Sequence, residues 1–381
     1  MQIENPIATT ENCRYCLMCR HTCPVGFVTN KETLTPHGWG LTIASVKRGL
    51  LTWNEETVGV LYSCADCGLC RAHCVTDQPL PDAIAAARAE VVAQKLAPAA
   101  VYELDLALQE WGNPFAEKRP ESAGDRGEVA LFVGDDAYYA WPSVLPAALR
   151  LLKAAGVEPV LVGAGRNNGY LASSLGLHDT AVSLARANLE ELGAAGASRL
   201  LVLTPGDYYT FGRLYEERLG IAWPEEVELM EVIPFLASRL ETGDIQFDSA
   251  VDGLPYAYVD PTHAVRVDGH GHDGRHGHDS RHGAPRRLLA ALTSTPGLNM
   301  FWREERAHPC GNTALQFTRP EISEQLTRAR LSDAVKVRAR RVITEDPGCL
   351  AQLSRYAPHF GLEVEGLYEL LANHLRKKPG F

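Results

Sequence analysis

The sequence predicts an α+β protein of several domains, in which a helical N-terminal domain precedes two α/β units that repeat each other and contain parallel sheets. Three observations support this prediction: two cysteine runs of equal spacing, helical patterns around them, and strands that alternate with helices later in the chain. We place the helical domain at 1–96, a connecting helix and linker at 97–127, and the two α/β units at 128–250 and 251–381.

Eight of the ten cysteines fall into two runs, which read Cys13-x-x-Cys16-x-x-Cys19-x-x-x-Cys23-Pro24 and Cys64-x-x-Cys67-x-x-Cys70-x-x-x-Cys74. This spacing lets three thiolates of a run hold one iron–sulfur cubane, while the fourth binds the cluster of the other run. We therefore expect two [4Fe–4S] clusters. The first would be bound by Cys13, Cys16, Cys19 and Cys74, and the second by Cys64, Cys67, Cys70 and Cys23.

Zinc sites and disulfides are the alternatives for these cysteines. Zinc sites usually space their ligands as two separated pairs, not as a run of four. Disulfides need an oxidising compartment, and the first residues, Met1 to Pro6, have neither the basic patch nor the apolar stretch of a signal peptide. The iron–sulfur interpretation is therefore favoured.

The composition is that of an ordinary globular protein, with 45% hydrophobic and 22% charged residues among 381. The formal net charge of −10 argues against a nucleic-acid partner. No apolar run approaches the ~20 residues of a membrane span, so we expect no transmembrane segment. The expected location is the cytoplasm, and a peripheral position at a membrane through a partner is the alternative.

Helical patterns surround both cysteine runs. Gly38 to Leu51 has apolar residues at a spacing near 3.6, and Pro81-Asp82 opens a helix over Ala83 to Leu96. The pattern predicts an α-helical ferredoxin-type domain and not the compact βαβ kind. A connecting helix is expected over Pro98 to Trp111, and 113–126 is a linker rich in Pro, Glu, Gly and Asp.

The first α/β unit contains short apolar runs that alternate with helical patterns. We expect strands at 129–133, 159–162 and 200–203, and helices at 142–155, 181–192, 233–240 and from Tyr208 onward. Strands that alternate with helices imply a parallel, doubly wound sheet.

The second α/β unit repeats the first. Tyr256 to Asp260 matches the first strand, and Arg341 to Thr344 matches the third. The loop Asp346-Pro347-Gly348-Cys349 resembles Thr204-Pro205-Gly206-Asp207, and helices are expected after it at 350–356 and 367–375. We expect the two units to face each other, with an active cleft where the carboxyl ends of their strands meet.

A histidine-rich segment, 268–283, interrupts the second unit. It contains five histidines among glycines and charged residues, a composition that cannot form a core. We expect a mobile surface loop, which either binds Zn²⁺ or Ni²⁺ weakly or is an inert insertion.

The two cysteine runs followed by two α/β repeats resemble the iron–sulfur subunits of the heterodisulfide-reductase and glycolate-oxidase group, the family with cysteine-rich CCG domains. Residues Thr35-Pro36-His37-Gly38 and Leu61-Tyr62-Ser63-Cys64 resemble the N-terminal pattern of this family. One departure is Val75, where the family often has proline.

The resemblance implies an electron-transfer subunit of an oxidoreductase, whose two clusters relay single electrons. It implies an FAD-linked dehydrogenase partner similar to glycolate or lactate oxidases, and a quinone or another redox protein as acceptor. Whether the chain is itself a complete enzyme is left open. The alternatives are a degenerate catalytic subunit similar to heterodisulfide reductase, working in the α/β cleft, and a non-enzymatic docking scaffold in which the clusters are structural.

The α/β repeats depart from the family's cysteine signature, which comprises a cysteine after the first strand, a Cys-Cys-Gly triplet and a later Cys-x-x-Cys. At these places this chain has Asp135 or Asp136, Asn167-Asn168-Gly169, Asp207, Thr262, Pro309-Cys310-Gly311 and Cys349. Two thiols cannot build the cluster pair that cleaves heterodisulfides, so this departure argues against that reaction.

Cys310 and Cys349 should each lie in a loop at the carboxyl end of a strand, so we expect them to meet. With His308 and His263 they are candidates for a third metal or cluster site. The alternatives are a redox-active thiol pair and two buried remnant cysteines that pack as small apolar groups.

Overall fold

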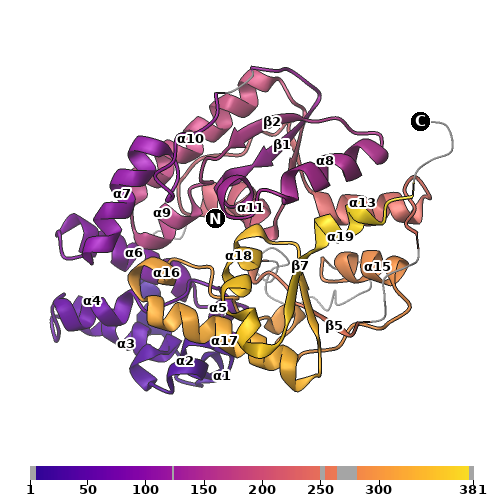
Figure 1. The fold of residues 1–381 in the computed structure, drawn as a ribbon. Coiled ribbons are helices and arrows are strands. Elements are labelled where there is room, and N and C mark those ends of the chain that lie inside the picture. Colours follow the sequence, from indigo (N-terminus) through magenta and orange to yellow (C-terminus); the bar gives the residue numbers. More distant parts are fainter. Residues whose placement is uncertain (1–5, 122–123, 249–253, 264–280, 377–381) are drawn as a thin grey trace.

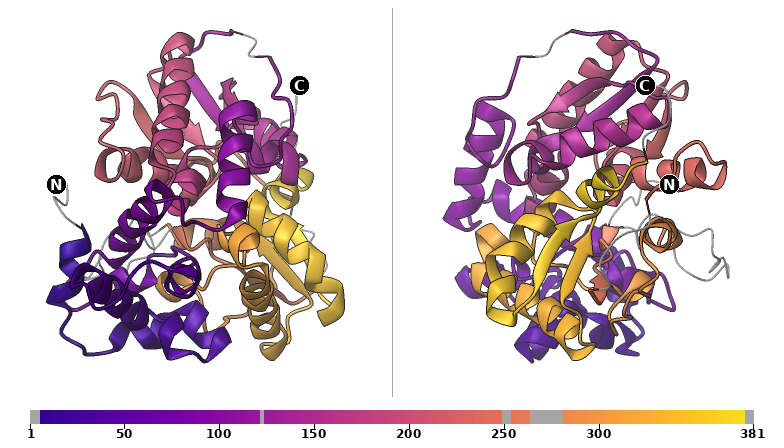
Figure 2. Two further views of the ribbon diagram at one scale, coloured as in Figure 1. Left: turned by 90° about the vertical axis from the view of Figure 1, so that its left-hand side faces the viewer. Right: turned by 45° about the vertical axis from the view of Figure 1, so that its right-hand side comes forward.

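Helices surround two small parallel sheets in the structure, a computed structural model that describes residues 6–121, 124–248, 254–263 and 281–376 (Figure 1). The predicted α+β class with parallel sheets is confirmed. The first α/β unit lies at the top of the views, and the N-terminal helices and the second unit lie side by side beneath it (Figure 2).

The N-terminal part, which includes both cysteine runs, contains only helices among its described elements. These are η1 (Pro6–Asn12), α1 (Met18–Thr22), α2 (Pro24–Thr29), η2 (Glu32–Leu34), α3 (Pro36–Lys47), α4 (Glu55–Leu61), α5 (Leu69–Ala72), α6 (Leu80–Ala93) and α7 (Ala99–Trp111). Helix α3 begins before the expected Gly38 because Pro36 occupies its first turn and Thr35 Oγ1 accepts a hydrogen bond from Gly38 N. It ends before Leu51 because Gly49 has a left-handed φ of 69°.

The first sheet has the parallel order β2-β1-β3-β4, built from β1 (Val129–Val133), β2 (Val160–Ala164), β3 (Arg199–Val202) and β4 (Glu228–Glu231). The sequence did not predict β4. The accompanying helices are η3 (Asp136–Ala140), α8 (Val144–Ala154), α9 (Tyr170–Leu175), α10 (His178–Ala195), α11 (Pro205–Tyr209), η4 (Thr210–Leu214), α12 (Tyr215–Glu217) and α13 (Val232–Glu241).

The second sheet has the parallel order β5-β6-β7, with β5 (Tyr256–Tyr258), β6 (Arg341–Thr344) and β7 (Glu363–Gly366). Its described helices are α15 (Gly283–Leu292), η5 (Glu304–Arg306), α16 (Leu315–Thr318), α17 (Pro320–Lys336), α18 (Pro347–Tyr356), η6 (Ala357–Phe360) and α19 (Leu367–Asn373). Most of the expected histidine-rich loop 268–283 lies outside the described residues.

Strand register shows that the two units share one plan. Val129 of β1 pairs with Arg199, and Tyr256 of β5 pairs with Arg341. Arg199 and Arg341 in turn pair with the first residues of β4 and β7. The strands β5-β6-β7 therefore correspond to β1-β3-β4. With the same offset in residue number, Asp135 is equivalent to Thr262, and Asp136 is equivalent to His263.

Strand β1 is buried on both faces and connects the parts of the molecule. Ala130 and Phe132 belong to a core shared with the N-terminal helices, whereas Leu131 and Val133 belong to a core shared with the second unit. Tyr368 joins the two units directly, because its hydroxyl donates to the carbonyl of Leu203 at 2.7 Å. In the part of the chain that the structure describes, no helix is long and apolar enough to cross a membrane.

A buried ion pair holds the second cysteine run against the first α/β unit. Arg218, at the end of α12, reaches both carboxylate oxygens of Asp66 at 3.1 and 3.2 Å, and Asp82 at 2.7 Å. Burial alone would lower the pKa of Arg218, but the charges of Asp66 and Asp82 hold it well above its ordinary value.

We predict that Arg218→Met destabilises the protein by about 3–5 kcal/mol, because it leaves the Asp66 and Asp82 carboxylates buried without this partner. Thermal or urea unfolding measures the loss. Arg199→Met is the matched control, because its ion pair with Glu228 is largely exposed and should contribute under ~1 kcal/mol. Equal losses in the two variants would show that Arg218 is not a buried link.

Candidate functional site

The first predicted cysteine set lies together. Cys13, Cys16, Cys19 and Cys74 line one cavity, although Cys74 comes from the second run. Burial raises the pKa of the Cys19 thiol to about 11, and the neighbouring Cys13, Cys74 and Cys16 add to this rise. The structure therefore gathers the four residues that the sequence assigns to one cluster.

The second predicted set lines an adjacent cavity. Its members are Cys23, Cys64, Cys67 and Cys70, and Cys70 also contributes to the wall of the first cavity. Burial raises the pKa of Cys64 to about 12 and places the pKa values of Cys23 and Cys70 well above the ordinary thiol value. Here, too, one cysteine is exchanged between the runs.

The two cysteine loops have the same unusual backbone conformation. The second residue after the first cysteine is left-handed in both loops, with φ 53° at Tyr15 and 50° at Asp66. The residue after the second cysteine is also left-handed, with φ 61° at Leu17 and 78° at Gly68. Non-glycine residues adopt this conformation at a cost, and such strain gathers at functional sites.

Backbone N–H groups point at the sulfurs in these loops. Tyr15 N donates to Cys13 Sγ at 3.4 Å, and Asp66 N donates to Cys64 Sγ at 3.3 Å. Gly26 N and Gln78 N donate to the sulfurs of Cys23 and Cys74, each at 3.4 Å. Hydrogen bonds of this kind stabilise thiolates and tune the potential of iron–sulfur clusters.

The chemistry of the donor set fits iron–sulfur clusters. Because burial raises the pKa values of Cys64 and Cys70 so far, these thiols would be protonated near neutral pH when free. Bound iron would instead hold them as thiolates. Within the described residues, no three His, Cys, Asp or Glu side chains converge so as to hold a single metal ion. The sulfurs instead line the walls of two cavities, as ligands of a cubane would.

The two cavities differ in their exposure. The first is bordered by Tyr15, Met18 and Leu41, whose side chains are 51%, 49% and 41% exposed. The second is bordered by the buried Cys23 and Cys64, and by Asp66, which accepts hydrogen bonds from Tyr170 and Arg218 of the first α/β unit. We call the first the outer cysteine group and the second the inner cysteine group.

Three contacts connect the inner cysteine group to the α/β units. The Tyr170 hydroxyl donates to the carbonyl of Asp66 at 2.9 Å, and Asp66 is the neighbour of Cys67. The buried Arg88 donates to the carbonyls of Cys64 and Ser174 at 2.9 and 2.6 Å. His308 Nε2 lies 3.2 Å from the carbonyl oxygen of Thr22, the residue before Cys23.

A cavity of about 130 Å³ lies where the carboxyl ends of the strands of the two units meet, as predicted. We call it the cleft. Its lining includes the carboxyl groups of Asp135, Asp136, Asp207 and Asp346, together with Cys310 and Cys349. By the family resemblance, either Asp135 or Asp136, and also Asp207, stand where the family has cysteine, so the cleft has oxygen in place of sulfur at these two positions.

Burial raises the pKa of these carboxyl groups. The pKa values of Asp135 and Asp346 rise to about 7, where the negative charge of Asp136 adds to the burial, and that of Asp207 rises to about 6. Side-chain amides limit the shifts: Asn167 donates to Asp135 at 2.8 Å, and Asn168 donates to Asp207 at 2.8 Å.

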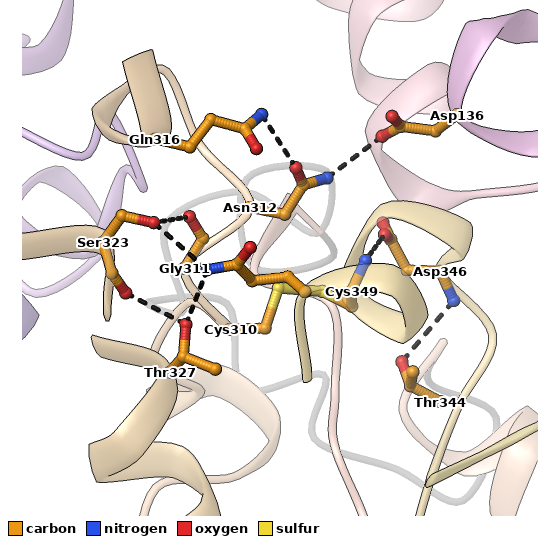
Figure 3. Close-up of a disulfide and its surroundings, with 11 residues drawn as sticks. Asp136, Cys310, Gly311, Asn312, Gln316, Ser323, Thr327, Thr344, Asp346 and Cys349 are labelled. Carbon is orange, nitrogen blue, oxygen red and sulfur yellow. Dashed lines mark hydrogen bonds between the residues drawn. A yellow bond between two sulfur atoms is a disulfide. The ribbon is translucent and has the colours of Figure 1, made fainter. Parts of the chain in front are cut away.

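The two units carry equivalent side-chain pairs in the cleft. Cys310 and Cys349 are joined by a disulfide, with their Cα atoms 5.7 Å apart (Figure 3). At the corresponding positions of the first unit, Asn168 donates a hydrogen bond to Asp207. Thr204 and Asp346, three residues before Asp207 and Cys349, cap α11 and α18 in the same way.

Glycine is required beside both pairs. Gly169 and Gly311, which follow Asn168 and Cys310, have φ values of 93° and 100°. A Cβ on Gly311 would lie 2.2 Å from Thr327 Oγ1. Ser323, on the same helix as Thr327, donates to the Gly311 carbonyl at 2.8 Å (Figure 3). The glycine of the family triplet is therefore retained for backbone geometry, independently of the cysteines.

The structure does not assemble the proposed third site into one ligand set. Both sulfurs of Cys310 and Cys349 are used in the disulfide. His263 lines the cleft and packs edge-on against Tyr170. His308 turns away from it toward Thr22 and stacks on Trp302, and burial lowers its pKa to about 3. Of the alternatives predicted from sequence, the thiol pair describes the observed geometry best.

Sequence reasoning missed two groups of functional interest. The sequence indicates Asp346 only as part of a repeated loop, whereas in the structure its side chain caps α18 and the residue lines the cleft. The contacts of Arg218 and Tyr170 with Asp66 were not foreseen, because nothing in the local pattern indicates a partner more than 100 positions away.

We predict that stability falls as pH rises from about 4 to about 7. The folded pKa of Asp135, about 7, lies above its ordinary value of 3.8, so the folded state binds more protons in this window. Asp135→Asn should remove a cost on the order of 2–4 kcal/mol at pH 8 and leave stability at pH 4 nearly unchanged. Unfolding midpoints across pH measure both effects.

Asp125→Asn is the matched control, since Asp125 is exposed. It should leave the pH profile as in the parent protein. A parent protein that is equally stable at pH 5 and pH 8 would contradict the buried, protonated state of Asp135.

Comparison with known proteins adds three findings. A family model for the cysteine-rich domain named CCG matches residues 271–354. The chain is 23% identical over 340 residues to a subunit of the dihydromethanophenazine:CoB–CoM heterodisulfide reductase of Methanosarcina barkeri, across 84% of this chain and 79% of that protein. The corresponding protein of Methanosarcina acetivorans is 22% identical over the same length.

The chain is also similar to a ferredoxin and to a solved structure. A probable membrane-anchored ferredoxin of Chromohalobacter salexigens is 25% identical over 268 residues, which is 67% of this chain but 37% of that protein. A crystal structure of a hypothetical protein from Helicobacter pylori matches the fold with a TM-score of 0.59 over 98% of this chain and 77% of that chain, at 12% identity. The chain thus contains a segment that matches the cysteine-rich CCG domain, and most of its length is similar to these heterodisulfide reductase subunits.

Proposed function

We propose that this chain is the iron–sulfur electron-transfer subunit of an oxidoreductase. One observation carries the proposal: two four-cysteine groups, each containing one cysteine from the other run, line adjacent cavities. Two [4Fe–4S] clusters held in this way would pass single electrons between a partner at the surface and the interior of the protein. The relatives named as heterodisulfide reductase subunits and a ferredoxin support an iron–sulfur redox function.

The exposure of the two groups gives the relay a direction. The outer cysteine group lies beside exposed apolar side chains, including Tyr15, Met18 and Val75, on which a redox partner could pack. The inner cysteine group contacts the α/β units through Tyr170 and His308. Electrons would enter or leave at the outer group and reach the cleft side through the inner group.

The partner is proposed from family resemblance. An FAD-linked dehydrogenase similar to glycolate or lactate oxidases would supply the electrons, and a quinone or another redox protein would accept them. Acting in the cytoplasm, directly or at a membrane-bound partner, is part of the same proposal. A second candidate function is chemistry in the cleft, which the disulfide and the buried carboxyl groups favour.

We predict that the pure, anaerobically isolated chain contains about eight irons, and that each ligand variant loses about four. Because Cys74 and Cys23 are each assigned to the cluster of the other run, the proposal predicts which variants lose the same cluster. Cys74→Ala should leave the same residual electron paramagnetic resonance spectrum as Cys13→Ala, and Cys23→Ala should match Cys64→Ala. If Cys74→Ala instead matched Cys64→Ala, the runs would not exchange ligands, and zinc in place of iron would reject the proposal outright.

We further predict that a flavin-containing dehydrogenase copurifies with the tagged native chain. Addition of glycolate or lactate to that complex should reduce the clusters and bleach their visible absorption. The Cys16→Ala variant, which lacks the outer cluster, should still bind the partner but lose the bleaching of the remaining cluster. A complex without flavin, or one in which neither acid reduces the clusters, would exclude this partner.

A further inference from the structure

The disulfide between Cys310 and Cys349 borders the cleft and is connected to the inner cysteine group. Both cysteines belong to the cleft lining, although their side chains are only 3% and 7% exposed. Cys310 follows His308 by two residues, and His308 contacts the backbone beside Cys23. The disulfide therefore borders the cleft and is linked through His308 to the backbone beside the inner cysteine group.

The contact at His308 is held in place by aromatic packing. The ring stacks on Trp302 with a centroid distance of 3.8 Å and an interplanar angle of 17°. Phe27 packs edge-on against both rings, with centroid distances of 5.8 Å. These contacts fix Nε2 at 3.2 Å from the Thr22 carbonyl oxygen. A short path of covalent bonds and one hydrogen bond thus runs from Cys23 through Thr22, His308 and Pro309 to Cys310.

The position of Cys349 suits a sulfur that becomes a thiolate. It is the third residue of α18, and its backbone N–H donates to Asp346 Oδ1 at 2.8 Å. Negative charge is stabilised at the N-terminus of a helix, which favours the thiolate of a cysteine in the first turn. Asn312 also lines the cleft, and its side-chain amide donates a hydrogen bond to Asp136 at 3.0 Å (Figure 3).

The first α/β unit has no sulfur at the positions that correspond to Cys310 and Cys349. There Asn168 and Asp207 form a hydrogen bond that cannot accept electrons. The position that corresponds to His308 is Arg166, whose guanidinium donates to Glu191 at 2.8 Å. Residues next to both triplets contact the inner cysteine group, His308 in the second unit and Tyr170 in the first, and the second unit alone has a sulfur pair at its triplet.

We propose that Cys310 and Cys349 form a redox-active disulfide that accepts two electrons from the iron–sulfur clusters, an inference that rests on the function proposed above. The disulfide would take up two electrons, one from each of the clusters that the two cysteine groups would hold. The S–S bond breaks to give two thiolates, of which that of Cys349 is favoured by the N-terminus of α18, and two protons then convert both sulfurs to thiols. The protons come from water through the carboxyl groups of the cleft, among which Asp136 accepts a hydrogen bond from Asn312 and Asp346 accepts one from the backbone N–H of Cys349.

The proposed site turns single-electron transfer into a two-electron store. Iron–sulfur clusters exchange electrons singly, whereas a disulfide takes up a pair, so the reduced dithiol would hold both electrons between single-electron transfers. This gives the α/β units a redox role that does not require the lost cluster-binding cysteines.

The test follows the state of Cys310 and Cys349 in the iron-loaded protein. Samples are reduced anaerobically with limiting dithionite and quenched in denaturant with light N-ethylmaleimide. Remaining disulfides are then reduced and marked with the heavy reagent before peptide mass spectrometry. We expect both cysteines to carry the heavy label in oxidised protein and the light label after the clusters are reduced. Iron content and cluster spectra are measured on the same samples.

Three variants isolate the route. Cys310→Ser with Cys349→Ser should keep about eight irons and take up about two fewer electrons per chain in an anaerobic titration. In the Cys67→Ala variant, which would lack the inner cluster, the disulfide should be reduced at least ~10-fold more slowly. His308→Phe keeps an aromatic ring but loses the hydrogen bond, so it should slow disulfide reduction ~10-fold without changing cluster content. His359→Phe, at an exposed position, is its control.

Several results would overturn the inference. In one, the clusters of the parent protein become reduced while Cys310 and Cys349 keep the heavy label. In another, the disulfide is reduced equally fast with and without the inner cluster, which would make it a direct target of dithionite. A protein with no iron would reject the proposed function itself, and the iron measurement distinguishes that failure from the other two.

Discussion

The exchange of one cysteine between two loops is the constraint on which the rest of the structure depends. Cys74 lies with Cys13, Cys16 and Cys19, and Cys23 lies with the cysteines of the second run. Both loops must therefore face each other with matching backbone shape, and both have left-handed residues at equivalent positions. Short helices pack around this pair of loops, and Arg88 and Arg218 bind the inner loop to the first α/β unit.

The α/β units use one fold for two chemical environments. Equal strand registers place equivalent loops on opposite sides of the cleft, where one unit has the Asn168–Asp207 hydrogen bond and the other has a disulfide. The last residue of each triplet, Gly169 or Gly311, is glycine because the backbone there has a positive φ. Carboxyl and amide groups take the place of thiols in the first unit, and hydrogen bonds between them hold the same loops together there.

The same arrangement gives the molecule an order from surface to interior. The outer cysteine group lies among exposed apolar side chains, the inner group lies against the α/β units, and the cleft lies beyond it. Strand β1 packs toward the N-terminal helices on one face and toward the second unit on the other, so the parts are connected through shared cores.

The sequence by itself determined the cysteine sets, the helical N-terminal part, the parallel sheets and the repeat, because spacing and periodicity act over short stretches of chain. It placed most strands, but missed β4 and β7, whose edge positions leave them half-exposed and without a clear apolar run. Only the tertiary structure decided what depends on distant partners. It joined Cys310 to Cys349 and turned His308 away from them toward Thr22. It also buried Asp346 in the cleft and brought Arg218 to Asp66, contacts that local pattern cannot encode.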